Sequence, residues 1–418
     1  MMWLLYLAGV RCYLLAIRVA SFFIPKAKLW IDGRAEQVPL WEQLAAKKEK
    51  RIWFHCASLG EFEQGRPLLE QLRKEYPDHK IVLTFFSPSG FVVRKNSPLA
   101  DAVFYMPMDH PVTSKKFIAA IQPSMAFFVK YEFWYFYGRE LSKKKIPFFC
   151  ISAIFRPSQI FFKPLIGIFF RKMLLRFTQI FVQDQDSLKL LYKERITNVT
   201  VSGDTRYDSV YQNFTHSESI PEIELFCGHD KIMICGSTWP DDETIFFPLI
   251  ESTAGKIKFI IAPHEINKTH LEQLKNTIKR PAIFFSDWIK KPDQTFEILI
   301  IDNVGMLSKL YKYGHFAYIG GGFGAGIHNI LEAAVYGLPV FFGPNYKRFR
   351  EANELIARKG AFPVNDEDHL LVMFASLVES PSLYQSILEN NKQFVFDKIG
   401  TTELIMKFLS VNYPANLK

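Results

Sequence analysis

The fold class of this chain is decided by the stretch Gly320-Gly321-Gly322-Phe323-Gly324-Ala325-Gly326-Ile327-His328-Asn329-Ile330-Leu331-Glu332. The apolar run His315–Ile319 before it predicts a strand, and a helix-like pattern begins at about His328. A strand that ends in a glycine-rich turn before a helix lets backbone N–H groups face a phosphate. We therefore expect the first turns of this helix to carry His328, Asn329 and Glu332 toward the sugar ring of a nucleotide.

Two further stretches place polar residues directly after apolar runs. One is His55-Cys56-Ala57-Ser58-Leu59-Gly60-Glu61, and the other is Ala262-Pro263-His264-Glu265. Each follows a predicted strand, at Ile52–His55 and at Lys258–Ile261. We interpret the three stretches as one nucleotide-sugar site that is split over two domains.

Short apolar runs alternate with amphipathic stretches from Arg51 onward, which is typical of βαβ units and a parallel sheet covered on both faces. The first series of predicted strands is Ile52–His55, Ile81–Phe86, Ala102–Tyr105, Met125–Val129, Pro147–Ile151 and Gln179–Val182. The second series is Lys231–Cys235, Lys258–Ile261, Glu297–Ile301, Phe316–Ile319 and Pro339–Phe342. The polar, less patterned segment Thr205–Ile220 separates them. The pattern predicts two doubly wound α/β domains facing a cleft.

The 418 residues are enough for two domains with substantial cores. We place a membrane anchor at residues 1–25, a first Rossmann-like domain at 33–208 and a second one at 221–381. A C-terminal helical region at 382–418 can pack back on the first domain.

The N-terminal segment is apolar except for Arg11 and Arg18, which share one face of a helix. Its longest uncharged run, Met1–Val10, is too short to span a bilayer unaided. One interpretation is a signal peptide with a weak cleavage site at Val19-Ala20-Ser21, and the other is a retained anchor whose arginines snorkel. The basic residues that follow are Lys26, Lys28 and Arg34. By the positive-inside tendency they favour a retained anchor, spanning or interfacial, with a cytoplasmic body.

The amino-acid composition limits the classes of molecule that the protein is expected to bind. A net charge of +9 favours nucleic acid, phospholipid or a phosphorylated substrate. Five scattered cysteines favour a reducing compartment, and the chain has no metal-ligand spacing, so we expect no metal and no cofactor. The basic aromatic stretch Phe161–Arg176 is either a membrane-surface segment or a core helix with a solvated edge. It matches no nucleic-acid motif, and the anchor argues against that partner.

The chain resembles the 3-deoxy-D-manno-octulosonic acid (Kdo) transferases of lipopolysaccharide inner-core assembly. The family's His-x-Ala-Ser-x-Gly-Glu is His55–Glu61, and its Gly-Gly-His-Asn-x-Leu-Glu appears as Gly326–Glu332, followed by Gly343-Pro344. The other matching blocks are Thr84–Gly90, Tyr105–Asp109, Tyr131–Trp134 and Gly203–Asp208.

The resemblance implies a GT-B glycosyltransferase with an inverting, metal-independent mechanism. It implies CMP-Kdo as the donor and a lipid A precursor, tetraacyldisaccharide 1,4'-bisphosphate, as the acceptor. It also implies a location at the cytoplasmic face of the inner membrane. Two departures stand out: the family's arginine before the histidine is missing at His264, and its second glycine is Ile327. Phosphate contact then falls to Lys268 or to backbone amides.

The resemblance makes Glu61 the catalytic base that takes the proton of the acceptor hydroxyl. From its position alone, Glu61 is equally a helix cap. The predicted donor-binding residues are Ser237, Thr238, His264, Glu265, Lys268, Gly322, Phe323, Gly324, His328, Asn329 and Glu332. The predicted acceptor-binding residues are Ser58, Gly60, Glu132 and Arg206. Asn329 either holds the phosphate or caps the helix, and Glu332 is expected to accept from the ribose hydroxyls.

Two other functions stay open at this point. One is a GT-B transferase that uses another sugar nucleotide on a membrane lipid. The other is a membrane-bound lipid or nucleic-acid binder that keeps the fold without catalysis.

Overall fold

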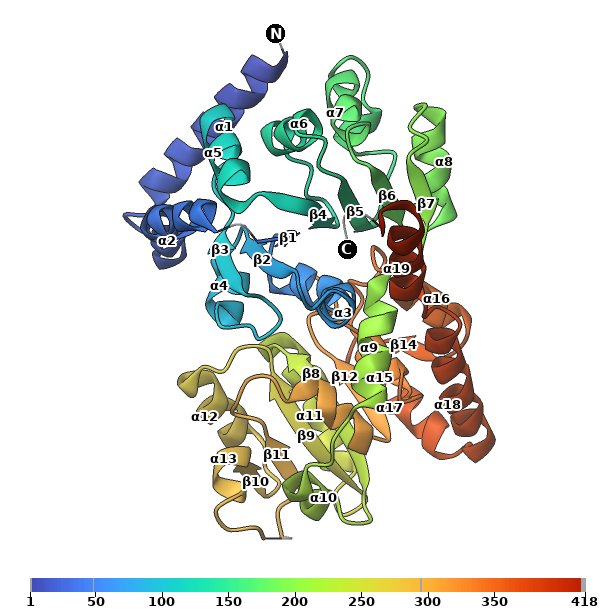
Figure 1. Ribbon diagram of the computed structural model, residues 1–418. Coiled ribbons are helices and arrows are strands. Elements are labelled where there is room, and N and C mark those ends of the chain that lie inside the picture. The colour runs from blue at the N-terminus through green and yellow to red at the C-terminus, as the bar shows by residue number, and fades with distance from the viewer. Residues whose placement is uncertain (1, 48, 294, 415–418) are drawn as a thin grey trace. The chain divides into compact units, whose positions relative to one another are not determined.

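The computed structural model describes residues 2–47, 49–293 and 295–414. The chain forms two compact α/β units (Figure 1). Unit 1 comprises Met1–Ser209 and Gly400–Lys418, and unit 2 comprises Val210–Ile399. The predicted functional boundaries at 33–208, 221–381 and 382–418 stay predictions.

Unit 1 is built on a seven-stranded parallel sheet in the order β3-β2-β1-β4-β5-β6-β7. Its strands are β1 (Arg51–Cys56), β2 (Lys80–Phe85), β3 (Ala102–Tyr105), β4 (Pro123–Val129), β5 (Phe148–Ala153), β6 (Gln179–Val182) and β7 (Val199–Val201). Every residue of β1 is buried, as expected for a central strand with helices on both faces.

The helices of unit 1 are α1 (Met2–Ala20), α2 (Pro25–Glu42), α3 (Leu59–Glu75), α4 (Pro88–Arg94), α5 (Pro111–Ile121), α6 (Tyr135–Lys143), α7 (Ile166–Leu174), α8 (Gln185–Lys193), the first residues of α9 (Thr205–Thr215), and α19 (Thr401–Asn412). Successive side chains of a strand point to opposite faces, so Trp53 and Phe54 enter different cores. Trp53 belongs to the core cluster with residues of α5 and α6, and Phe54 to the one with residues of α3 and α19.

Unit 2 repeats this plan with the strand order β10-β11-β9-β8-β12-β13-β14, again all parallel. Its strands are β8 (Lys231–Thr238), β9 (Ile257–Pro263), β10 (Ala282–Phe284), β11 (Ile298–Ile300), β12 (Phe316–Ile319), β13 (Val340–Phe342) and β14 (Ala361–Pro363). Its helices include α10 (Pro221–Cys227), α11 (Pro240–Ser252), α12 (Lys268–Thr277), α13 (Phe285–Trp288), α14 (Leu307–Leu310), α15 (Leu331–Ala334), α16 (Arg350–Ala357), α17 (Glu367–Val378) and α18 (Pro381–Phe396).

Each sheet has a topological switch point, where neighbouring strands continue in opposite directions across the sheet. In unit 1 it lies between β1 and β4, and in unit 2 between β8 and β12. Open parallel sheets bind ligands outside the carboxyl ends of the strands at such points. The loops that follow these four strands are therefore the places to look for a site.

All eleven strands predicted from the sequence are confirmed, with small shifts at their ends. Three strands, β7, β10 and β14, were missed. Each has three residues and lies at the edge of its sheet, too short to show a hydrophobic period. The polar, less patterned segment Thr205–Ile220 contains one helix, α9, at Thr205–Thr215.

The C-terminal stretch is divided between the two units. α18 places Ile387 in the core of unit 2, whereas α19 places Ile405 and Leu409 in the core of unit 1. The start of α19 is held by Asp208, whose carboxylate accepts the backbone N–H groups of Gly400 (2.7 Å) and Thr402 (2.6 Å).

Within the described residues, one helix, α1, is long and apolar enough to cross a membrane. None of its residues is buried, and it contacts the rest of unit 1 through Tyr6 and Tyr13. The Tyr6 hydroxyl donates to Asp109 at 2.6 Å, and its ring lies 5.9 Å from Phe136 and 6.1 Å from Phe169. The apolar N-terminal helix predicted from the sequence is thus present and is fastened to unit 1.

Replacement of Asp208 by alanine is expected to release the start of α19. Two N–H groups lose their acceptor, which costs about 1–2 kcal/mol for a helix cap. Amide hydrogen exchange should show faster exchange along α19. Asp186→Ala is the control, because that carboxylate is 86% exposed on α8. Unchanged protection of α19 in Asp208→Ala would contradict the assigned role.

Candidate active site

In unit 1, Glu61 lies beside the switch point. β1 ends at Cys56, Ser58 is the N-cap of α3, and Glu61 stands in the first helical turn. The Ser58 hydroxyl donates to one carboxylate oxygen of Glu61. The Lys130 Nζ lies 3.9 Å from the other oxygen, and the Glu61 side chain is still 23% exposed. The carboxylate is therefore oriented by two neighbours and remains open to a reactant.

Lys130 comes from the other side of the switch point, directly after β4, with a φ of +71°. A left-handed backbone is unfavourable for lysine, and such strain is concentrated at functional sites. Lys130 was not predicted from the sequence, although it directly precedes the matching block Tyr131–Trp134.

Glu132 is 9% exposed and takes part in an internal network. Its Oε2 lies 2.9 Å from His55 Nε2 and accepts the indole N–H of Trp134 at 2.8 Å. His55 Nδ1 in turn lies 2.8 Å from the hydroxyl oxygen of Thr84. This network ties together the ends of β2, β1 and β4. An acceptor-binding role for Glu132 stays a prediction.

Arg206 is held beside α3 at the start of α9. Its guanidinium binds Asp204 through Nε (2.9 Å) and Nη2 (2.7 Å), and the Gln64 amide donates to the same carboxylate at 2.9 Å. Burial raises the pKa of Asp204, but the Arg206 charge and the hydrogen bonds outweigh it and hold that pKa below the usual value.

Tyr131 lies next to Lys130 and is surrounded by several charged side chains. Burial raises its pKa, the charges of Arg156 and Arg206 lower it, and Glu61 raises it. Three cations, Lys130, Arg156 and Arg206, thus lie around Tyr131, and Lys130 also faces Glu61. Arg156, which follows β5, was also missed from the sequence. Gly60 is exposed, and a Cβ there would lie 3.7 Å from the Ser58 hydroxyl oxygen, an ordinary contact.

In unit 2, the glycine-rich turn after β12 is packed backbone against backbone. A Cβ on Gly320 would lie 2.2 Å from the Ser237 carbonyl oxygen, and one on Gly322 would lie 2.4 Å from the Gly343 nitrogen. Gly321 has a φ of +89°, and its N–H donates to Asp242 at 2.7 Å. The glycines are therefore required first for the close packing of this loop.

Some N–H groups of the turn are consumed inside the protein. Besides Gly321, Gly324 donates to the Gly321 carbonyl at 3.1 Å. The N–H groups of Gly322 and Phe323 make no hydrogen bond within the described parts of the chain, so these two can meet an anion. The Phe323 ring lies against Gly343.

The predicted helix start at His328 was wrong. The helix, α15, begins at Leu331 and has four residues, so His328 and Asn329 precede it and do not share a helical face with Glu332. The His328 N–H donates across the loop to the Gly320 carbonyl at 3.1 Å, which holds the chain out of helical geometry. Ile327, where the family has glycine, is buried at 3% exposure.

Asn329 has the contacts of a helix cap. Its side-chain oxygen accepts the N–H of Leu331 at 3.2 Å, and its amide donates to Glu332 at 3.1 Å. Of the two roles considered for Asn329, capping is the one that these contacts serve.

His264 and His328 are brought together in a column of three rings. The Trp239 ring lies 4.7 Å from His264, and His264 lies 4.3 Å from His328, both stacked. The Trp239 indole donates to His328 Nε2 at 3.2 Å.

The pKa of His328 is lowered to about 4, chiefly by burial and to a smaller extent by the nearby His264. His328 is thus neutral near pH 7 and carries its proton on Nδ1. Trp239 was missed, although it directly follows the predicted Gly236-Ser237-Thr238.

The remaining predicted donor residues have different surroundings. Thr238 is buried and its hydroxyl donates to Glu243 at 3.0 Å, whereas Ser237 is half-buried with a φ of +54°. Glu265 and Lys268 are exposed, in the loop after β9 and at the first residue of α12.

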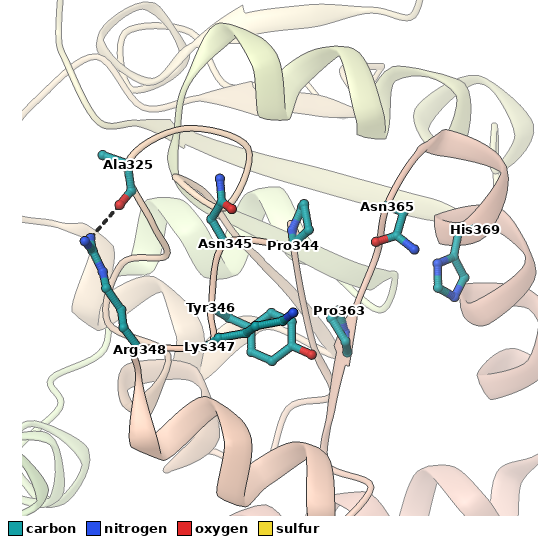
Figure 2. A pocket seen from close by; sticks show the side chains of 9 residues that line it. All are labelled: Ala325, Pro344, Asn345, Tyr346, Lys347, Arg348, Pro363, Asn365 and His369. Carbon is teal, nitrogen blue, oxygen red and sulfur yellow. Dashed lines mark hydrogen bonds between the residues drawn. The ribbon is translucent and has the colours of Figure 1, made fainter.

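An open polar pocket of about 680 Å³ adjoins the glycine-rich turn (Figure 2). Arg348 and Ala325 lie at one end of it, and Asn365 and His369 at the other. The Arg348 guanidinium donates to the Ala325 carbonyl at 2.5 Å, and the Asn345 amide donates to the Gly324 carbonyl at 2.9 Å. With Lys347 also on its wall, the pocket suits an anionic ligand. The sequence analysis had noted only Gly343-Pro344 here.

Two glycine replacements in the turn should differ sharply. Gly322→Ala forces a methyl group to within 2.4 Å of a backbone nitrogen, whereas the nearest atom for Gly324→Ala is 3.8 Å away. Overpacking of this kind costs about 1–3 kcal/mol. Thermal unfolding should show a clear loss for Gly322→Ala and none for Gly324→Ala. Equal melting temperatures of the two variants would refute the packing role.

His328 should titrate far below the ordinary histidine pKa of 6.5. Since its folded pKa is lowered, its neutral form contributes stability above pH 6.5, and this is lost as the pH falls toward about 4. An NMR titration of the imidazole measures this directly. In His264→Ala the pKa should rise only in part, because burial is the larger cause. A midpoint near 6.5 in the wild type would show that the ring is not held as described.

Comparison with known proteins agrees with this geometry. A family model described as 3-deoxy-D-manno-octulosonic-acid transferase (kdotransferase) matches residues 33–209. The 3-deoxy-D-manno-octulosonic acid transferase of Chlamydophila psittaci is 25% identical over 83% of this chain and 81% of the relative. That of Aquifex aeolicus is 26% identical over 78% of this chain and 86% of the relative.

The solved structures extend the agreement to the fold. The UDP-GlcNAc 2-epimerase of Neisseria meningitidis superposes with a TM-score of 0.61 at 15% identity, covering 87% of this chain and 100% of that one. This likeness concerns the two-domain GT-B-type architecture alone, and it confirms the predicted fold class. The sequence matches confirm the resemblance: over most of its length the chain is similar to 3-deoxy-D-manno-octulosonic acid transferases, which are glycosyltransferases.

Proposed function

We propose that this protein transfers Kdo from CMP-Kdo to tetraacyldisaccharide 1,4'-bisphosphate, the lipid A precursor, with inversion and without a metal ion. The observation that carries the proposal is Glu61, held by Ser58 and faced by Lys130 at the switch point of unit 1. It lies inside the stretch matched by the family model, and the curated relatives are named for Kdo transfer.

An inverting displacement needs one base for one proton. The acceptor hydroxyl oxygen forms the bond to the anomeric carbon of Kdo while its proton passes to the Glu61 carboxylate. The bond between the anomeric carbon and the phosphate oxygen breaks at the same time, and CMP leaves with that electron pair. The Ser58 hydroxyl orients one carboxylate oxygen, so the base is positioned before the acceptor arrives.

The leaving phosphate needs hydrogen-bond donors in place of a metal. In unit 2 the N–H groups of Gly322 and Phe323 and the Nδ1–H of neutral His328 are suited to this role. Ser237, His264 and Lys268 remain proposed donor ligands that border the same loops. The basic wall at Lys347 and Arg348 supports binding of an anionic sugar nucleotide.

The proposed acceptor carries phosphates, and unit 1 offers Lys130 beside Glu61 and Arg156 and Arg206 around the neighbouring Tyr131. Charge-assisted bonds from arginine to phosphate are among the stronger hydrogen bonds. We propose that the acceptor's phosphates bind to this cluster and that Ser58, Gly60 and Arg206 line its path.

We also propose that α1 holds the enzyme at the cytoplasmic side of the inner membrane. Lys26 and Lys28 follow the apolar helix and are on the side that the positive-inside tendency assigns to the cytoplasm. Arg34 supports this less than expected, because its guanidinium packs 3.5 Å from the Trp30 ring centre and donates to the Phe86 carbonyl at 2.6 Å.

Glu61→Gln should fold and bind both substrates but lose transfer. Removal of a general base lowers the rate by about 10²–10⁴-fold. The assay mixes purified protein, CMP-Kdo and the lipid A precursor and weighs the product by mass spectrometry. Glu63→Gln is the matched control, since Glu63 pairs with Arg66 and Arg94 instead.

Undiminished transfer by Glu61→Gln would remove Glu61 from the base role. Wild-type protein that turns over a UDP-sugar but not CMP-Kdo would favour the alternative donor. Binding to lipid vesicles without any turnover would favour the non-catalytic alternative.

A further inference from the structure

An apolar pocket of about 450 Å³ lies between α1 and the body of unit 1. Its size falls within the about 300–1,000 Å³ of small-molecule sites. Its walls come from α1 and from the loops after β2, β3 and β4. The lining residues are Tyr6, Gly9, Val10, Tyr13, Phe86, Met108 and Trp134.

On the walls, the polar side-chain atoms of Tyr6 and Trp134 are bound to partners in the protein. Tyr6 donates to Asp109, which also accepts the N–H groups of Phe136 and Tyr137. The Trp134 indole donates to Glu132 at 2.8 Å. The Phe86 and Trp134 rings stack at 5.3 Å. A polar ligand would leave hydrogen-bonding groups unpaired on these ring and hydrocarbon surfaces, whereas an alkyl chain would not.

The pocket adjoins the candidate catalytic residues of the same unit. The Phe86 N–H donates to the Cys56 carbonyl at 3.3 Å, and the next residue, Ser87, donates to the Ala57 carbonyl at 2.7 Å. Phe86 is thereby fixed to the loop that leads to Glu61. The pocket and the cations around Glu61 lie at one edge of one sheet, as required for a ligand with a phosphorylated head and an apolar tail.

α1 also supplies a route for such a tail. Its outward side is apolar, with Leu5 62% and Leu15 63% exposed. By its length and apolar composition, this helix can lie in the hydrocarbon layer of a membrane. Because α1 forms one wall of the pocket, a chain can pass from the bilayer into it without crossing water.

We propose that this pocket binds one acyl chain of the lipid acceptor and thereby sets its position relative to Glu61. The inference rests on the proposed transfer to an acylated, phosphorylated sugar. It adds a binding site for the tail to the cationic site for the head group.

The test fills the pocket from α1. A Cβ added at Gly9 meets no atom within 4 Å, so Gly9→Leu can extend into the pocket, and leucine favours the helix over glycine. Ala8→Leu is the matched control, because the neighbouring position is exposed and does not line the pocket. Full-length proteins are assayed in vesicles of phosphatidylethanolamine and phosphatidylglycerol. The two acceptors are the tetraacylated disaccharide bisphosphate and the same compound after deacylation.

In Gly9→Leu the KM for the acylated acceptor should rise roughly tenfold, the loss expected when a few methylene groups are excluded from an apolar site. Its kcat, and both constants for the deacylated acceptor, should stay at the wild-type values, which also shows that the variant is folded. Ala8→Leu should match the wild type with both acceptors.

Three results would overturn the inference: an unchanged KM for the acylated acceptor, an equal rise for both acceptors, or the same rise in Ala8→Leu. The first two leave the proposed function standing, since the wild type still transfers Kdo. Wild-type protein that transfers Kdo to neither acceptor would defeat the proposed function itself, and the inference with it.

Discussion

The geometry of a parallel sheet governs where chemistry can occur in this protein. All strands of one sheet end at the same edge, and the order of strands reverses between β1 and β4 and between β8 and β12. At these two points the loops diverge and leave room for side chains. Glu61 and Lys130 meet because they follow β1 and β4, and Trp239 and His328 meet because they follow β8 and β12. Residues far apart in the chain thus become neighbours through strand order alone.

Many of the glycines and polar side chains near these two points make contacts inside the protein that stabilise the fold. Gly320 and Gly322 let backbones approach, Asp242 accepts the Gly321 N–H, and Asn329 accepts the Leu331 N–H at the start of α15. Glu132 joins strand ends through His55 and Trp134. This internal use leaves a smaller set of groups free to meet substrate, and a more specific one. In unit 1 this set includes the partly exposed Glu61 carboxylate, and in unit 2 two backbone N–H groups and the neutral His328.

Unit 1 combines two environments that rarely adjoin in a soluble enzyme. Cations surround Tyr131 and Glu61, and a pocket of aromatic and aliphatic side chains lies a few residues away under α1. The buried Asp109 fastens the pocket wall: burial raises its pKa to about 6, and it accepts hydrogen bonds from α1 and from the start of α6. A charged head group and an apolar tail on one molecule would each find a matching surface.

The sequence by itself determined the long strands, the two-domain plan, the apolar N-terminal helix and the resemblance to the Kdo transferases, because hydrophobic periodicity and motif order are local properties of the chain. It did not determine the short edge strands β7, β10 and β14, whose three residues are extended only because a neighbouring strand pairs with them. It placed the helix of the glycine-rich segment three residues early, because a hydrogen bond from His328 to Gly320 holds the chain open there. The stacking of Trp239, His264 and His328, the pairing of Lys130 with Glu61 and the pocket beside Gly9 were decided by tertiary structure. Each joins loops or elements that are distant along the chain, so no local pattern records it.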